Sequence, residues 1–183
     1  MNLISSHFHE EKKYIRALLL IASILLWIAL MAVVIWFSSK PAPESSKQSV
    51  SVGKWICSIV TPGFNSMPSD KQLEYAMLIE KFVRKTAHFI EFMVLGFFTI
   101  NAIRFILSAL SVTRLSLLEL NNRLIIIISL IWCIIFATSD EIHQLFVPGR
   151  YGSPVDVLLD SVGSLCGIML YFLIFRINKK AER

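Results

Sequence analysis

The fold is decided by residues 124–150, which read LIIIISLIWCIIFATSDEIHQLFVPGR. The first half of this stretch, 124–137, is almost entirely apolar and suits a helix that crosses hydrocarbon. The polar stretch SDEIHQLFVPGR, residues 139–150, follows without a linker, so ionisable groups lie at one end of that helix. Such groups are costly near a bilayer unless they find partners, and they indicate a functional site.

Composition also indicates an integral membrane protein. The chain has 183 residues, of which 55% are hydrophobic, and its net charge is +5. It is therefore too apolar for an ordinary soluble domain and too short for a large transporter. Its Lys and Arg residues flank apolar runs instead of clustering with exposed aromatic residues, which favours membrane lipids as partners and argues against nucleic acid. The odd number of cysteines, three, predicts no disulfide framework.

Four apolar runs predict four membrane helices, because each is close to the roughly 20 residues that span a bilayer core of about 30 Å. The expected helices cover about residues 17–37, 86–107, 124–146 and 155–175. The domain 17–175 is then flanked by a polar arm, 1–16, and a basic tail, 176–183. The first run is too long for a signal-peptide core and lacks a small-residue cleavage site, so we expect a retained anchor.

Residues 38–85 are expected to form an outer loop, because the PAP segment at 41–43 stops the first helix. Up to residue 69 this region is expected to be mostly loop, with room for a short interfacial piece near 52–60. From Ser69 onward, apolar side chains on one side predict an amphipathic helix at the membrane surface. The expected fold class is an all-α membrane protein: a four-transmembrane-helix bundle with an outer interfacial amphipathic helix before the second membrane helix.

The distribution of positive charge predicts the orientation of the chain. Lys and Arg are denser in the arm 1–16, in the connection after the second membrane helix and in the tail 176–183 than in the longer loops on the other side. Positive charge accumulates on the cytoplasmic side of membrane proteins. We therefore expect both termini in the cytoplasm and the polar segments on the outer face.

Three polar segments are expected to meet at that outer end of the bundle. Spacings of three and four place some residues of each segment on one helix face. These residues are Arg84, His88 and Glu91 in the first segment, Asp140, His143 and Gln144 in the second, and Asp156 and Asp160 in the third. Glu141 is expected to point about 100° away from the second set. Gly163 and Gly167 continue the stripe of the third set and allow a neighbouring helix to approach closely.

The candidate ligand-binding residues combine both signs of charge with histidine and glutamine. They are Arg84, Lys85, His88, Glu91, Asp140, Glu141, His143, Gln144, Arg150, Asp156 and Asp160. In one interpretation these groups satisfy one another and form a purely structural clasp. In a second, they bind an anionic lipid-linked headgroup, since the Arg fork suits phosphate and Lys adds charge at the level of lipid phosphates.

Catalysis is a third interpretation, with or without a metal ion. Histidine beside carboxylate is the usual general-base pair, and the same groups supply oxygen and nitrogen ligands for a divalent ion. The candidates are His88, Glu91, Asp140, Glu141, His143, Asp156 and Asp160. Neither H-E-x-x-H nor G-x-S-x-G occurs in the chain, so the reaction, the metal and any cofactor stay open. A channel is disfavoured because the polar clusters are confined to one end.

Four motifs resemble those of the VanZ-like family of bacterial membrane proteins. They are FSSxP at 37–41, RKxAHFxEF at 84–92, SDExHQxFVPGR at 139–150 and DVxxDxxG at 156–163. The motifs occur in this order and the resemblance covers most of the chain from 17 to 175.

The resemblance implies a role in the bacterial cell envelope, in the cytoplasmic membrane. Members of this family are linked to resistance to teicoplanin-type glycopeptide antibiotics, which act outside the membrane on the lipid-linked wall precursor. We therefore expect an outer-leaflet pocket that binds, or chemically alters, a lipid-linked headgroup or a lipoglycopeptide. The alternatives are a membrane-embedded hydrolase or transferase, which a metal could assist, and a structural or adaptor protein.

Overall fold

The computed structural model describes residues 2–111 and 122–181, and within these ranges the chain is all-helical. The elements are α1 (Asn2–Ser38), α2 (Ala42–Val60), the short 3-10 helix η1 (Phe64–Ser66), α3 (Ser69–Ser111), α4 (Asn122–Gln144) and α5 (Pro154–Ala181). No strand occurs in the described part of the chain. The predicted all-α fold class is confirmed.

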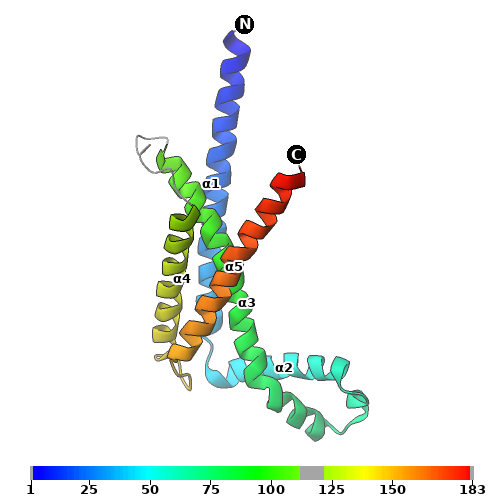
Figure 1. The fold of residues 1–183 in the computed structure, drawn as a ribbon. Helices are drawn as coiled ribbons and strands as arrows, with labels where there is room; N and C mark the ends of the chain where they lie inside the picture. The colour runs from blue at the N-terminus through cyan, green and yellow to red at the C-terminus, as the bar shows by residue number, and fades with distance from the viewer. Residues whose placement is uncertain (1, 112–121, 182–183) are drawn as a thin grey trace.

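Four helices are long and apolar enough to cross a membrane. The candidate spans are Ala17–Ser38, Ser69–Leu107, Asn122–Gln144 and Pro154–Phe175. The four-helix prediction is therefore confirmed, and the chain is a multi-pass membrane protein. Both ends of the chain lie at one end of the bundle, and α2 and the α4–α5 turn lie at the other (Figure 1).

The predicted arm and tail are helical continuations of the first and last helices of the chain. Helix α1 begins at Asn2, so it runs through the arm predicted for 1–16, and α5 continues to Ala181 within the predicted tail. Residue 1 and residues 182–183 lie outside the described residues. So do residues 112–121, which contain most of the expected polar connection after the second membrane helix.

The prediction of a mostly irregular loop between residues 38 and 69 is wrong, because α2 occupies 19 residues of it. Its buried stripe is made of small side chains spaced four apart, Ser45, Ser49, Gly53 and Cys57. A Cβ on Gly53 would lie 3.1 Å from the Ala76 carbonyl oxygen of α3, so the two helices pack closely. Serine and glycine have low helix propensity, but this packing against α3 outweighs it.

The expected interfacial helix and the second membrane helix are one continuous helix. Helix α3 runs for 43 residues without a proline, and Gly96 is its only glycine. Its first part lies alongside α2, away from the bundle, and its later part enters the bundle (Figure 1). The basic pair Arg84 and Lys85 therefore lies inside an unbroken helix instead of between two helices.

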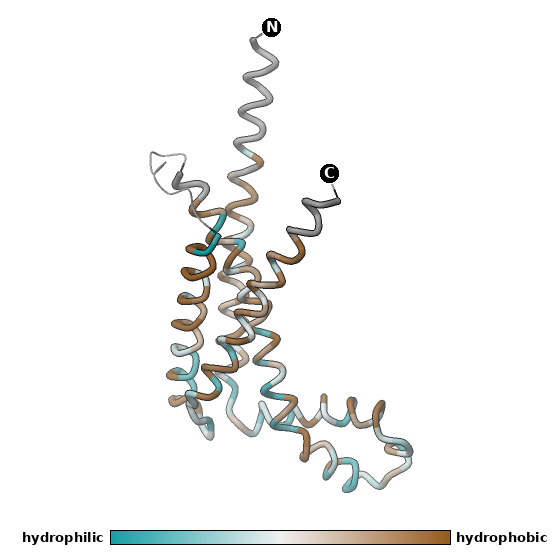
Figure 2. The backbone as a smooth tube through the Cα atoms, viewed as in Figure 1, coloured by the Kyte–Doolittle hydropathy of each residue, from teal (hydrophilic) through white to brown (hydrophobic). Residues whose placement is uncertain are grey.

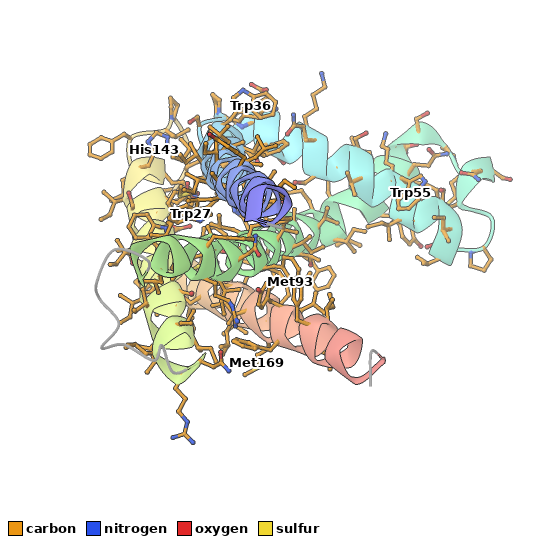
Figure 3. The ribbon with its side chains drawn as sticks, turned by 90° about the horizontal axis from the view of Figure 1, so that it is seen from above. Trp27, Trp36, Trp55, Met93, His143 and Met169 are labelled. Carbon is orange, nitrogen blue, oxygen red and sulfur yellow. The ribbon has the colours of Figure 1, made fainter. Side chains whose placement is uncertain are left out.

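Helices α3 and α5 approach each other at the predicted small-residue stripe. A Cβ on Gly163 would lie 2.6 Å from the Phe89 carbonyl oxygen, and a Cβ on Gly167 only 1.8 Å from that of Met93. Figure 3 shows Met93 between the two helices. No larger side chain fits at these positions without separating the helices, so the expected close approach is confirmed.

Apolar and polar side chains occupy different levels of the bundle. One buried apolar cluster includes Ile100, Ile125 and Ile168, and a second includes Phe92 and Leu95. Hydrophilic residues gather at the end of the bundle where α4 ends and α5 begins (Figure 2). This polar end contains the residues considered next.

Candidate functional site

The turn after α4 directs the polar end of the bundle back toward α1 and α2. The Pro148 carbonyl accepts a hydrogen bond of 3.1 Å from the Ala42 amide at the start of α2. Gly149 has a φ of 74°, in the left-handed region that glycine adopts without Cβ strain. The turn thereby brings Arg150 against the end of α1, where it makes the contacts described below.

A buried hydrogen-bond network joins α1, α4 and this turn. Ser38 Oγ donates to Asp140 Oδ2 at 2.8 Å, and Gln144 Nε2 donates to the same oxygen at 3.0 Å. Gln144 Nε2 also donates to Glu141 Oε1 at 3.1 Å. The Gln144 Oε1 atom accepts from Arg150 Nη1 at 3.2 Å. We call this network the clasp; its members are Ser38, Asp140, Glu141, Gln144 and Arg150.

Arg150 also fastens the chain that leaves α1. Its Nε donates to the Lys40 carbonyl at 2.9 Å and its Nη2 to the Phe37 carbonyl at 3.3 Å. Carbonyls at a helix C-terminus lack partners within the helix and favour a nearby cation. Burial lowers the pKa of the Arg150 guanidinium, the cation of Arg84 lowers it further, and the carboxylate of Asp140 opposes this shift. The donated hydrogen bonds offset part of the cost of burying this charge.

The predicted face of α4 differs from the observed one. Glu141, which was expected to point away, joins Asp140 and Gln144 in the clasp and is 6% exposed. His143 instead lies beside the end of α1, with Nε2 3.0 Å from Ser39 Oγ (Figure 3). Gln144 follows Glu141 by three residues and Asp140 by four, and both spacings bring side chains together on a helix. Asp140 and His143 both contact the end of α1, through Ser38 and Ser39. Glu141 contacts Gln144 and the Ser153 amide instead.

Four residues of α3 lie near the clasp and make fewer hydrogen bonds within the protein than the clasp residues do. We call them the α3 row: Arg84, Lys85, His88 and Glu91. Arg84 Nη1 lies 3.5 Å from Glu80 Oε1 in the same helix. Lys85 Nζ forms an ion pair with Asp156 Oδ1 of α5. The Lys85–Asp156 pair is partly exposed, so solvent screens it and it contributes little to stability. The Arg84–Glu80 pair is less exposed, since Glu80 is buried.

The other two members of the α3 row contain buried atoms without hydrogen-bond partners. His88 Nδ1 and Glu91 Oε2 are 3.8 Å apart, too far for a hydrogen bond. Each is buried without a hydrogen-bond partner in the described structure, as are both carboxyl oxygens of Asp160 and Oδ1 of Asp140. Such atoms cost free energy unless another group binds them. Of these four residues, His88 and Glu91 line the pockets described next, where a ligand atom could supply the missing partner.

A pocket of about 600 Å³ lies between three residues of the α3 row and three of the clasp. We call it the polar pocket, and residues from all three predicted segments line it. The predicted residues among its lining are Arg84, Lys85, His88, Glu141, Gln144, Arg150 and Asp156. Its far wall includes Ser153, whose amide donates to Glu141 Oε2 at 2.7 Å. The pocket therefore places cations from α3 and from the turn after α4 around one space.

The remaining predicted residues lie elsewhere. Glu91 lines a second pocket, of about 500 Å³, between α2 and α3. Asp140, His143 and Asp160 line neither of these two pockets. Asp160 is 1% exposed and lies in the helix interface beneath the polar end. The described residues contain no group of three His, Cys, Asp or Glu side chains that could hold a metal ion, and the hypothesis of a metal-assisted hydrolase or transferase stays a prediction.

The structure adds residues that sequence reasoning left out of the site. Ser38 is fully buried and bonds Asp140, although it was interpreted only as part of a helix end. Glu80 is paired with Arg84 and lines the polar pocket. The FSSxP motif at 37–41 was a signal for Ser38, and the spacing of four between Glu80 and Arg84 was a signal for that pair.

Comparison with known proteins places these features in one family. A family model described as VanZ/LLP1 matches residues 23–176. No curated protein and no solved structure matches the chain. The matched range includes every residue of the clasp and of the α3 row, together with the residues that line both pockets. The VanZ-like family predicted from the four motifs is therefore confirmed.

Proposed function

Because the chain belongs to the VanZ/LLP1 family, we propose that its polar pocket binds the anionic headgroup of a membrane amphiphile in the bacterial cell envelope. The amphiphile is a lipid-linked molecule, such as a wall precursor, or a lipoglycopeptide of the teicoplanin type. Both share an anionic group joined to a hydrocarbon chain. The observation that carries the proposal is the set of cations around one pocket.

Three cationic side chains from two sides line the polar pocket: Arg84, Lys85 and Arg150. An Arg fork binds phosphate or carboxylate oxygens in pairs, and a Lys adds a mobile charge. Lys85 is held only by a partly exposed ion pair with Asp156, so an incoming anion replaces a weak contact there. Arg150 keeps its hydrogen bonds within the protein and contributes a fixed positive charge to the pocket wall.

The place of the pocket in the fold supports a membrane ligand. Its wall includes Glu141 and Gln144 in the last turn of α4 and Asp156 in the first turn of α5. Hydrophilic residues gather at this end of the bundle (Figure 2). Lipid phosphates occupy this level of a bilayer. The distribution of positive charge favours a position outside the cytoplasm for this end, the side where lipid-linked wall precursors and lipoglycopeptides are exposed.

Binding to the purified protein in a neutral detergent tests the proposal. The probes are farnesyl diphosphate for a lipid-linked headgroup and teicoplanin for a lipoglycopeptide, measured by native mass spectrometry. Lys85→Ala is expected to weaken binding about tenfold, the usual effect of losing one charge-assisted contact. Lys71→Ala is the matched control, since Lys71 lies on the same helix as Lys85 and is paired with a carboxylate, that of Glu74, but does not line the polar pocket.

The outcome distinguishes the two kinds of ligand, a lipid-linked headgroup and a lipoglycopeptide. Binding of farnesyl diphosphate alone supports the lipid-linked headgroup, and binding of teicoplanin alone supports the antibiotic. Equal affinities of the Lys85→Ala and Lys71→Ala proteins for both probes would contradict the proposal. That result would favour the second candidate role, a structural clasp, which the hydrogen bonds of Ser38, Gln144 and Arg150 support.

A further inference from the structure

The second pocket has a different chemical character from the polar pocket. It has a volume of about 500 Å³ and lies where α1 ends, beside α2 and the middle of α3. Most of its wall is apolar, and includes Phe37, Val52, Ile56, Phe82 and Ile90. We call it the apolar pocket.

The two pockets adjoin at one set of side chains. Arg84, His88 and Arg150 line both of them. A ligand in the apolar pocket therefore ends against the same cations that face the polar pocket. This arrangement, a hydrocarbon-lined space that leads to a cationic one, has the polarity of a lipid molecule.

We propose that the apolar pocket binds the hydrocarbon chain of the ligand whose anionic headgroup occupies the polar pocket. The inference rests on the proposed function and specifies the ligand as a chain-bearing phosphate or similar anion, bound through both parts. A volume of 500 Å³ lies within the usual range of about 300–1,000 Å³ for small-molecule sites, which are mostly apolar with a few polar groups.

Near the junction of the two pockets, two buried polar atoms have no hydrogen-bond partner in the described structure. His88 Nδ1 and Glu91 Oε2 both belong to residues that line the apolar pocket, and neither has a hydrogen-bond partner. Because they are 3.8 Å apart, one oxygen atom can lie within hydrogen-bond distance of both. A hydroxyl close to the point where a lipid's chain joins its headgroup can accept from one and donate to the other.

Alkyl phosphates of different length test the inference, because they keep the headgroup and vary the chain. The full-length protein in a neutral detergent is titrated with methyl phosphate and with dodecyl phosphate, and binding is followed by native mass spectrometry. Ile56→Trp fills the apolar pocket. It is expected to weaken binding of dodecyl phosphate about tenfold, a typical effect of losing a few buried methylene contacts, and to leave methyl phosphate binding unchanged.

Ile59→Trp is the matched control, since Ile59 lies on the same helix, is 65% exposed and does not line the apolar pocket. Partition of the probe into detergent is the same for both proteins and cancels in the ratio of their affinities. Val52→Phe provides a second, smaller obstruction from the same helix. It keeps the test decisive if the tryptophan variant does not fold.

The outcomes distinguish the inference from the proposed function. If the Ile56 and Val52 variants bind dodecyl phosphate as tightly as Ile59→Trp while Lys85→Ala binds it more weakly, the chain subsite is overturned and the headgroup site stands. If Lys85→Ala and Lys71→Ala bind it equally, the headgroup site fails and the inference fails with it. Selective weakening by the pocket-filling variants, together with weakening by Lys85→Ala, supports both.

Discussion

The clasp and the α3 row both contribute residues to the wall of the polar pocket, and they use similar residue types in different ways. In the clasp, Gln144 and Arg150 each make several hydrogen bonds to other parts of the chain. In the α3 row, Lys85 has a partly exposed ion pair, and His88 and Glu91 each have a buried atom without a hydrogen-bond partner.

This difference separates groups that hold the fold from groups that are free to bind. A polar side chain whose hydrogen bonds are satisfied within the protein has little to offer a ligand. An unsatisfied one reduces stability in the absence of ligand. Stability and ligand binding should therefore respond in opposite ways to substitutions on the two sides of the pocket.

The largest effect is expected where the clasp is broken. Arg150→Ala removes the hydrogen bonds to Phe37, Lys40 and Gln144 and leaves nearby carboxylates without their cation. We expect the free energy of unfolding to fall by about 3 kcal/mol, as for other buried charge networks that lose one member. Denaturation in mixed micelles, followed by tryptophan fluorescence, measures it.

Arg150→Lys provides the control for this experiment. It keeps the charge but cannot donate in three directions from a planar fork, so an intermediate loss of stability is expected. If Arg150→Ala were as stable as the unmodified protein, the clasp would not hold α1 to the turn after α4.

A smaller effect of opposite sign is expected in the α3 row. Glu91→Leu removes a buried carboxylate oxygen without a hydrogen-bond partner and places an apolar side chain in a mainly apolar pocket. We expect the free energy of unfolding to rise by about 1 kcal/mol. Glu74→Leu, at an exposed position of the same helix, should change it by less than about 0.5 kcal/mol. A loss of stability in Glu91→Leu would place Glu91 with the clasp.

The smallest effect concerns the ion pair that holds Lys85. Asp156→Asn removes the partner of Lys85 and one negative charge from the polar pocket. Affinity for dodecyl phosphate is expected to rise about threefold, which corresponds to the free energy of a partly exposed ion pair. Glu74→Gln removes the equivalent partner of Lys71 and should leave the affinity unchanged. Weaker binding by Asp156→Asn would show that this carboxylate contacts the ligand.

Much of the fold was predictable because the bilayer imposes simple rules. Apolar runs of sufficient length indicated the four spans, and the spacing of Gly163 and Gly167 indicated the close contact of α3 with α5. Helix α2 was missed because its buried face consists of Ser, Gly and Cys, which carry no hydrophobic period. Its helical state depends on contacts with α3 that lie far away in the sequence.

The sequence predicted many of the residues that gather at the polar end, but not which of them bond to one another. Helical spacing correctly placed Asp140 and Gln144 together, but it did not predict that Gln144 would also bond Glu141 while His143 contacts Ser39 of α1. Nor could it show that Arg150 would bind backbone carbonyls at the end of α1. Hydrogen bonds between distant segments decide these roles, and periodicity within one helix does not contain that information.

The continuity of α3 has a mechanical consequence. At about 1.5 Å per residue, its 43 residues measure roughly 65 Å, about twice the thickness of a bilayer core. The part of α3 before Lys85 packs on α2, and the part after it packs on α5. Because the helix is continuous, the part that packs on α2 cannot turn about its axis without turning the part that packs on α5.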